Sequence, residues 1–198
     1  TFSEHPLKVL AGKEPPALFT GDVKDEVFRS TGIEVVKLDF ASIMHMSPEA
    51  FFEEILFKTL HVAGVCCGFN YRFGNKAAGD PKLLMEMSLE KGFGIHVMEP
   101  FKLNGEVVSS TLIRRAIEDG DIKKCDSLLG RRYSIGGEVV VGNRLGRTIG
   151  FPTSNLIIDE TMVTPPSGVY ITYCIYDGVK YPSITNVGFK PTIGEYDK

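Results

Sequence analysis

The sequence has no tryptophan, and its 198 residues include only four cysteines and four histidines. No two cysteines are spaced as Cys-x-x-Cys, so neither a disulfide framework nor a zinc site is indicated, and a reducing compartment fits. The scattered histidines favour structural or surface roles over metal binding. No hydrophobic run approaches the ~18 residues of a membrane span, and the chain does not open with a basic and then apolar signal segment. We therefore expect a cytoplasmic protein that has no membrane partner.

A strong overall charge of either sign is also absent. The 22 basic and 25 acidic residues leave a formal net charge of −3, which argues against a dedicated nucleic-acid binder. The content of 43% hydrophobic and 24% charged residues is that of an ordinary globular protein. Positive charge is concentrated locally, because four arginines and one glutamate give residues 131–150 a charge of +3. Such a local field suits the binding of phosphate groups.

A glycine-rich loop at residues 142–156 has the features of a phosphate site. Three glycines recur at every fourth position, which lets the backbone approach a ligand closely. Two arginines supply charged forks that fit phosphate oxygens. These five residues are Gly142, Gly146, Gly150, Arg144 and Arg147. The glycines alone are equally typical of a connection between two strands, and the loop matches neither a Walker A motif nor the dinucleotide fingerprint.

The end of this loop adds two neutral oxygen ligands, Thr153 and Asn155, within the run Pro-Thr-Ser-Asn. A hydroxyl and an amide carbonyl suit a Mg²⁺ ion whose charge is met mainly by nucleotide phosphates and water. The loop therefore indicates a site for a magnesium nucleotide.

A second informative stretch lies at residues 108–115. Three hydroxyl residues, Ser109, Ser110 and Thr111, precede a predicted amphipathic helix. The free N–H groups and the positive end of the helix dipole favour an anion there, and Arg114 would supply a counter-charge. Plain capping of the helix by Ser109 or Ser110 explains the same pattern, and composition alone favours it.

Helices and strands alternate over the first 130 residues. We predict helices at about 22–31, 48–60 and 81–91, and strands at 33–38, 61–67 and 94–98. This alternation is typical of an α/β fold, a parallel sheet with helices on its faces in a Rossmann-like arrangement. The polar loop that follows the strand at 61–67 would lie at the carboxyl end of that sheet, where ligands collect.

Short strands dominate from Arg132 onward. They are predicted at 133–141, 156–158, 169–176 and 179–185, with Asp177-Gly178 as a two-residue hairpin turn. Such strands, separated by glycines, indicate an all-β domain that forms a small closed barrel. We place the boundary between the two domains near Gly130, which gives domains 1–130 and 131–198.

The loop sequence Gly-x-Arg-x-Gly-Arg-x-x-Gly-Phe-Pro-Thr-Ser-Asn-Leu resembles the signature of riboflavin kinases, many of which carry alanine where Ser154 stands. Upstream, Val-Ser-Ser-Thr-Leu-Ile-Arg at 108–114 resembles a signature of the nucleotidyltransferases that make FAD. Thr-Phe-x-x-His-Pro at 1–6 and the Gly-x-Asn segment at 68–79 are similar to further motifs of that family. The chain is thus identified as a member of the bifunctional bacterial riboflavin kinase/FMN adenylyltransferase family, the FAD synthetases.

The resemblance implies two sets of site residues. In the Rossmann-like nucleotidyltransferase domain, Asn70 and Arg114 would be catalytic. The nucleotide and FMN would be bound by His5, Pro6, Asn70, Ser109, Ser110, Thr111 and Arg114. In the riboflavin kinase domain, ATP and flavin would be bound by Gly142, Arg144, Gly146, Arg147, Gly150, Thr153, Asn155 and Asn186. Thr153 and Asn155 would contact the Mg²⁺.

The implied reactions are phosphorylation of riboflavin by Mg-ATP to give FMN, and adenylylation of FMN to give FAD and pyrophosphate. Two elements of the family are expected outside these residues: a His-x-Gly-His segment before Thr1 and the kinase glutamate after Lys198. We therefore expect a longer protein seen in part. Its partners would be small molecules and not nucleic acid, and its oligomeric state is not indicated. Two alternatives stay open: a relative that keeps one activity, and a non-catalytic flavin- or nucleotide-binding module.

Overall fold

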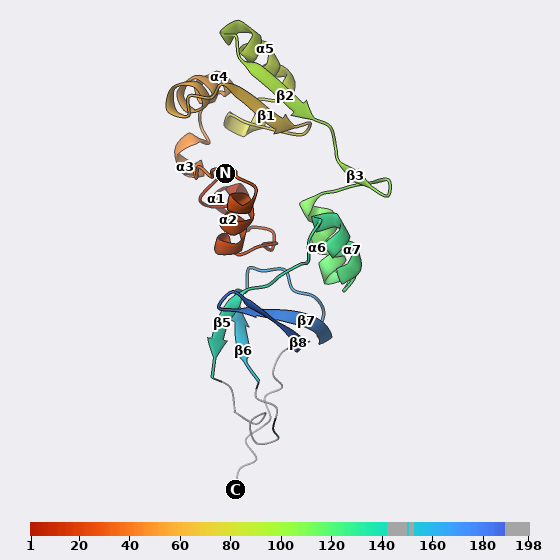
Figure 1. Cartoon of the computed structure of the whole chain (residues 1–198). Helices are drawn as coiled ribbons and strands as arrows, with labels where there is room; N and C mark the ends of the chain where they lie inside the picture. The colour runs from red at the N-terminus through yellow and green to blue at the C-terminus, as the bar shows by residue number, and fades with distance from the viewer. Residues whose placement is uncertain (142–149, 151–152, 189–198) are drawn as a thin grey trace. The chain divides into compact units, whose positions relative to one another are not determined.

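The computed structural model describes residues 1–141, 150 and 153–188 (Figure 1). Contacts divide the chain into two compact units. The first unit contains residues 1–15 and 25–108, and the second contains residues 16–24 and the described residues from 109 onward. Residues 109–130 thus group with the second unit, whereas the sequence placed them in the first domain. The domain limits 1–130 and 131–198 remain predictions.

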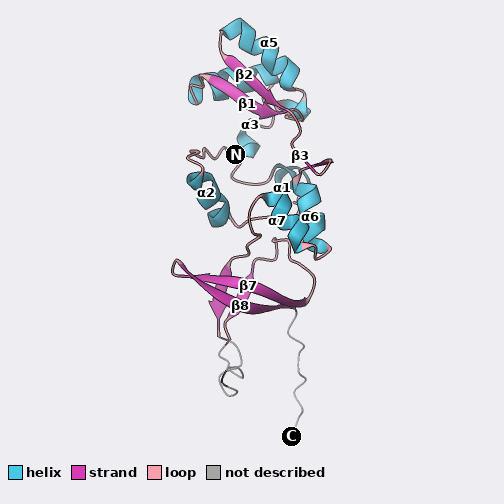
Figure 2. Cartoon of the chain, turned by 45° about the vertical axis from the view of Figure 1, so that its right-hand side comes forward, coloured by secondary structure: helices cyan, strands magenta, loops and turns pink. Residues whose placement is uncertain are grey.

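The first unit holds a parallel pair of strands, β1 (Gly64–Gly68) and β2 (Gly94–Met98). Their register runs from Gly64 opposite Gly94 to Gly68 opposite Met98. The chain between them forms a short 3-10 helix, η2 (Asn75–Ala77), and then the helix α5 (Pro81–Lys91). This strand, helix and parallel strand confirm the predicted order for residues 61–98, and Figure 2 shows the pair β1 and β2.

The ends of α5 follow directly from its sequence. The Asp80 carboxylate accepts a hydrogen bond from the Leu83 N–H at 2.9 Å, and Pro81 occupies the first helical position. Gly92 ends the helix in the left-handed conformation, with φ of 73°. The predicted limits of this helix are therefore confirmed.

The remaining elements of the first unit are short, and one of them, α2, begins within the segment 16–24 of the second unit. They are α1 (Pro6–Ala11), α2 (Gly21–Ser30), α3 (Phe40–Ile43), α4 (Pro48–Ala50), η1 (Phe51–Thr59), β3 (Lys102–Leu103) and β4 (Glu106–Val107). The Ser47 hydroxyl caps α4 by accepting from the Ala50 N–H at 3.1 Å. The helix predicted at 48–60 exists, but η1 continues it with π-type bonds, such as Leu60 N–H to the Ile55 carbonyl at 2.9 Å.

The core of the first unit lies between η1, β1 and α5. Its buried residues are Ile43, Phe51, Phe52, Cys67, Phe73 and Leu84. The Phe52 ring stacks on Phe93 with centroids 5.1 Å apart. The helix after Ser47 therefore contributes Phe51 and Phe52 to the core, with Ile55 and Leu56 packed against it.

The strand predicted at 33–38 is wrong. Residues 33–37 form no strand, and a single parallel bridge joins Phe2 to Leu38. The Ser3 N–H donates to the Leu38 carbonyl, and the Leu38 N–H donates to the Thr1 carbonyl, each at 2.9 Å. Apolar alternation alone does not form a strand where so little backbone lies alongside to pair with it.

The second unit contains two packed helices, α6 (Ser110–Glu118) and α7 (Ile122–Leu129). Ile113, Ala116 and Ile117 of α6 are buried, as are Cys125 and Leu128 of α7. The strands are β5 (Gly137–Val140), β6 (Asn155–Ile158), β7 (Gly168–Tyr176) and β8 (Val179–Val187).

The strand predicted at 133–141 starts later than expected because Tyr133 is bonded to α7 and to the segment between β6 and β7. Its N–H donates to Asp126 at 2.8 Å and its hydroxyl donates to the Val163 carbonyl at 2.6 Å. The strands predicted at 156–158, 169–176 and 179–185 correspond to β6, β7 and β8.

The described strands of this unit form two antiparallel pairs, β5 with β6 and β7 with β8. The turn at Asp177-Gly178 joins β7 to β8 as predicted, with φ of 51° and 75°. No closed barrel is formed by the strands that the structure describes, so the barrel remains a prediction.

Candidate functional site

The loop that leaves β1 carries Asn70, and it is fixed at its start by the neighbouring strand. The Phe69 N–H donates to the Met98 carbonyl of β2 at 2.9 Å, and the Tyr71 N–H donates to the Gly68 carbonyl at 3.0 Å. Asn70 lies between these two bonds and is exposed. An ideal Cβ on Gly68 would be 3.3 Å from the Asn70 Oδ1, so the side chain lies close against this glycine. Asn70 is therefore an accessible amide on a fixed backbone.

The rest of the loop is locked onto the core. Phe73 and Gly79 exchange two backbone hydrogen bonds, of 2.8 and 3.2 Å. A Cβ on Gly79 would lie 2.7 Å from the Phe73 ring, and one on Gly74 would lie 2.7 Å from the Pro48 nitrogen. The Asn75 N–H donates to the Met46 carbonyl at 2.6 Å. These contacts require glycine at both positions and hold the loop in one shape.

Two electrostatic features accompany the loop. Arg72 forms an exposed ion pair with Asp80, with Nη1 and Oδ2 3.5 Å apart. The hydrogen bond from the Leu83 N–H holds the pKa of Asp80 below its ordinary value, and Arg72 adds to the effect. Burial raises the pKa of Tyr71, whose ring stacks on Phe73 at 5.6 Å. Tyr71 and Phe73 therefore serve the packing of the loop, and Asn70 is the polar group that it presents.

His5 and Pro6 start the helix α1. The His5 Nδ1 accepts from the Leu7 N–H at 3.1 Å, and Pro6 is the first helical residue. The structure thus gives these residues a capping role. Their predicted contact with a nucleotide stays a prediction.

The hydroxyl residues before α6 divide between two roles. The Ser109 hydroxyl accepts from the Leu112 N–H at 3.2 Å and caps the helix, which confirms the capping interpretation for this residue. Ser110 and Thr111 form the first turn and are exposed. The start of α6 therefore leaves two hydroxyls accessible to a ligand.

Arg114 is the fifth residue of α6, and its guanidinium is already engaged. Its Nε donates to the carbonyl of Pro16 at 2.6 Å. The segment around Pro16 is itself fixed, because the Ala17 N–H donates to the Thr161 carbonyl at 2.6 Å and Ala17 bridges to Met162. Sequence reasoning missed this contact, since it joins residues 98 positions apart without a local pattern.

The segment at 16–20 brings a further basic residue into this region. The Arg131 guanidinium lies over the Phe19 ring at 4.7 Å from its centroid, and its Nε is buried without a hydrogen-bond partner among the described residues. Arg131 follows Gly130, the residue that ends α7. The structure therefore places Arg114 and Arg131 against the same segment.

The predicted kinase loop is described only in part. Gly142, Arg144, Gly146 and Arg147 lie outside the described residues. Gly150 has φ of 80° and Thr153 is exposed. Asn155 begins β6 opposite Val140, and Asn186 lies in β8 opposite Val169, so these two amides belong to different strand pairs.

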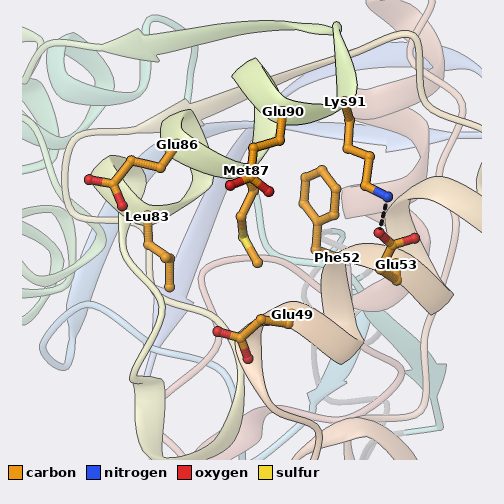
Figure 3. A pocket seen from close by; sticks show the side chains of 8 residues that line it. All are labelled: Glu49, Phe52, Glu53, Leu83, Glu86, Met87, Glu90 and Lys91. Atoms are coloured by element: carbon orange, nitrogen blue, oxygen red, sulfur yellow. Dashed lines mark ion pairs between the residues drawn. The ribbon is translucent and has the colours of Figure 1, made fainter.

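The first unit contains a cavity of about 260 Å³ (Figure 3). Its lining comes from α4, η1 and α5: Glu49, Phe52, Glu53, Leu83, Glu86, Met87, Glu90 and Lys91. Glu53 and Lys91 form an ion pair across it. This cavity therefore contains none of the predicted site residues.

The described residues contain no group of three or more His, Cys, Asp or Glu side chains that could hold a metal ion. In the same part of the chain, no helix combines the length and the apolar character that crossing a membrane requires.

Comparison with known proteins agrees with the two-part division. Residues 1–112 match a family model described as FAD synthetase, and residues 129–198 match one described as riboflavin kinase. A bifunctional riboflavin kinase/FMN adenylyltransferase of Bacillus subtilis (strain 168) is 34% identical over 98% of this chain and 62% of the relative. Its namesake from Escherichia coli (strain K12) is 35% identical over 97% of this chain and 62% of the relative.

A solved structure extends the likeness to the fold. A crystal structure described as a macrolide-efflux protein from Streptococcus pneumoniae has a TM-score of 0.84 and 29% identity, covering 95% of this chain and 62% of that one. The chain thus spans about 62% of the length of the curated relatives it matches. The comparisons confirm the predicted architecture of two consecutive domains.

Proposed function

We propose that this chain, which belongs to the FAD synthetase family, is part of an enzyme that converts riboflavin to FMN and FMN to FAD. The observation that carries the proposal is the match of two different family models to consecutive parts of one chain, residues 1–112 and 129–198. The first part would adenylylate FMN and the second would phosphorylate riboflavin. Both substrates and both products would be small molecules, used in the cytoplasm without nucleic acid or membrane.

The adenylylation requires a phosphate oxygen of FMN to attack the α-phosphorus of ATP, with pyrophosphate as leaving group. Positioning and charge neutralisation supply most of the catalysis in such phosphorus chemistry. Asn70 would orient a phosphate at the end of β1, and the exposed hydroxyls of Ser110 and Thr111 would donate to another. Arg114 would neutralise developing charge with its Nη atoms, while its Nε stays bonded to the Pro16 carbonyl. His5 and Pro6 would lie beside the nucleotide.

The kinase step requires the terminal hydroxyl of riboflavin to attack the γ-phosphorus of ATP, with ADP as leaving group. Glycines 142, 146 and 150 would let the backbone approach the phosphates, and Arg144 and Arg147 would contact their oxygens.

Thr153 and Asn155 are the proposed magnesium ligands of that step. Their chemistry fits, because both offer hard oxygen donors and both are exposed, Asn155 as the first residue of β6 and Thr153 two residues before it. When bound, Mg²⁺ would neutralise charge on the phosphates of ATP. Asn186 of β8 would contact the flavin or the nucleotide.

We further propose that the two strand pairs of the second unit belong to a closed barrel. Alternate residues of β7 are apolar and exposed: Val169 at 72%, Ile171 at 94% and Ile175 at 69%. Ile184, which pairs with Ile171 on β8, is 79% exposed. Strands of this composition are stable when one face is covered by another layer of the same domain. Barrel closure would provide that layer.

The proposal is tested by supplying the full-length protein with riboflavin, ATP and Mg²⁺ and separating the flavins by chromatography. We expect FMN to appear first and FAD to follow, and we expect FMN supplied alone to give FAD and pyrophosphate. Formation of only one product would favour a relative with a single activity. Tight flavin binding without any product would favour a non-catalytic binding module and contradict the proposal.

A further inference from the structure

We propose that Lys76 is a phosphate-binding residue of the first unit, held in place by a strained backbone so that its ammonium meets the phosphates of ATP or FMN. This inference rests on the proposed adenylylation and adds a residue to it. Lys76 lies in η2, within the connection from β1 to α5 that also carries Asn70. Ligands of open parallel sheets bind beside such connections, at the carboxyl ends of the strands.

The backbone at this point is strained. Lys76 has φ of 53° and ψ of 27°, and the next residue, Ala77, has φ of 58°. Five described residues other than glycine have positive φ. Among these five, Lys76 and Ala77 are the two that are adjacent in the sequence. The left-handed conformation is disfavoured for residues that carry a Cβ, and lysine and alanine lack the short polar side chain that eases it for asparagine by bonding to the local backbone. Strain of this kind clusters at ligand-binding sites.

The surroundings of the loop impose the strain. Gly74 is packed on Pro48, and the backbone bonds between Phe73 and Gly79 close the loop from both sides. The Asn75 N–H is fixed to the Met46 carbonyl. Residues 73, 75 and 79 are anchored by these bonds, and Lys76 and Ala77 between them have positive φ. Lys76 therefore starts from a backbone with little freedom, which lowers the entropy lost when it binds a ligand.

The charge of Lys76 is available. Its side chain is exposed, and it has no ion pair within the part of the chain that the structure describes. The other cation of this loop, Arg72, is paired with Asp80. An ammonium on a fixed backbone is a common point-charge partner of phosphate. The observations together favour a ligand role over a solvated surface charge.

The first test is Lys76→Gln in the full-length protein, with Lys58→Gln as the matched control. Lys58 is also an exposed lysine of the first unit, but it lies in η1, before the amino end of β1. We expect Lys76→Gln to lower kcat/KM for FAD formation by roughly ten- to a hundredfold, as for a lost charged hydrogen bond. A raised KM for ATP alone assigns the contact to ATP, and a raised KM for FMN alone assigns it to FMN. Lys58→Gln should keep both constants.

The second test separates strain from charge. Ala77→Gly keeps Lys76 but relaxes its backbone, and His61→Gly relaxes another left-handed residue, of φ 47°, before β1. We expect neither variant to lower the melting temperature strongly. Only Ala77→Gly should slow FAD formation, by several-fold, because Lys76 then loses its fixed position.

Calorimetric binding of ATP and of FMN distinguishes failure of this inference from failure of the proposed function. If the wild-type protein binds a nucleotide but forms no FAD, weaker binding by Lys76→Gln still supports the phosphate contact. Equal binding and equal rates for wild type and Lys76→Gln would overturn the role of Lys76 while leaving the enzyme intact. A wild-type protein that binds neither nucleotide would overturn both.

Discussion

Gly79 shows how a single missing Cβ shapes the proposed site. Its α-carbon packs on the Phe73 ring, and an added methyl group would lie 2.7 Å from it. We predict that Gly79→Ala lowers the free energy of unfolding by about 1–3 kcal/mol, because the buried ring must move. Urea denaturation measures the change. Gly94→Ala is the control, since a methyl group added there would meet no atom within 4 Å and its φ is not positive. Equal losses in both variants would contradict the packing explanation.

The position of Arg114 also leads to a prediction about FAD formation. Its Nε is committed to the Pro16 carbonyl, which orients the two Nη atoms as a fork. We predict that Arg114→Ala slows FAD formation from FMN by ~10²–10³, as for other lost contacts to developing charge. Lysine should restore little, because it cannot bond Pro16 and present a fork at once. Normal adenylylation by the alanine variant would leave Arg114 with only its structural bond.

At the scale of a single element, the packing of α7 against α6 predicts that the free energy of unfolding depends on pH. Cys125 is fully buried between the helices, and burial raises the pKa of its thiol to about 11. The unfolded thiol ionises near pH ~8.5. The pKa of Cys125 is thus higher in the folded protein than in the unfolded chain. The contribution of this thiol to the free energy of unfolding is therefore complete below pH ~8.5 and is lost as the pH rises toward about 11.

Urea titrations at pH 8, 9, 10 and 11 test this prediction. We expect the difference in unfolding free energy between wild type and Cys125→Ala to shrink steadily over this range. The comparison with the alanine variant removes the effect of other groups that titrate there. A constant difference would show that the thiol is hydrated in the folded protein. Cys66, which is exposed, should react with alkylating reagents at pH 8 much faster than Cys125.

Elements with local stop and start signals could be predicted from the sequence. The limits of α5 followed from Asp80, Pro81 and Gly92, each of which acts within one turn of the helix. The hairpin of β3 and β4 had an equally local signal, Asn104-Gly105, and could have been found from it. The strand expected at 33–38 failed because a strand depends on its partner, which local sequence does not reveal.

The candidate site was predictable in part for the same reason. Asn70 and Ser109 stand in recognisable local motifs, and the structure places the first at the end of β1 and the second at the cap of α6. Two other contacts join segments that are distant in the sequence, and no periodic pattern predicts them. They are the hydrogen bond from Arg114 to Pro16 and the contact of Arg131 with Phe19. The positive φ of Lys76 accompanies contacts of its loop with Met46 and Pro48, which are distant in the sequence. The local sequence therefore predicted which residues belong to the candidate site. The contacts that these residues make depend on tertiary structure and could not be predicted from it.

At the scale of the whole molecule, the proposed function assigns two reactions to two separate parts of the chain. Asn155 begins β6 in the second part, within the match to riboflavin kinase. Asn70 lies in the first part, within the match to FAD synthetase. A change at Asn155 should therefore affect one reaction only. Asn155 is exposed, so its truncation should move stability by no more than about 0.5 kcal/mol.

The most direct test is the full-length Asn155→Ala variant, supplied with ATP and Mg²⁺ together with riboflavin in one reaction and FMN in another. We predict that FMN formation from riboflavin falls by ~10²–10³, because a preorganised contact to the magnesium nucleotide is lost. FAD formation from supplied FMN should stay at the wild-type rate, and the melting temperature should be unchanged. Equal loss from both substrates, without loss of stability, would contradict the claim that the two reactions use separate sites.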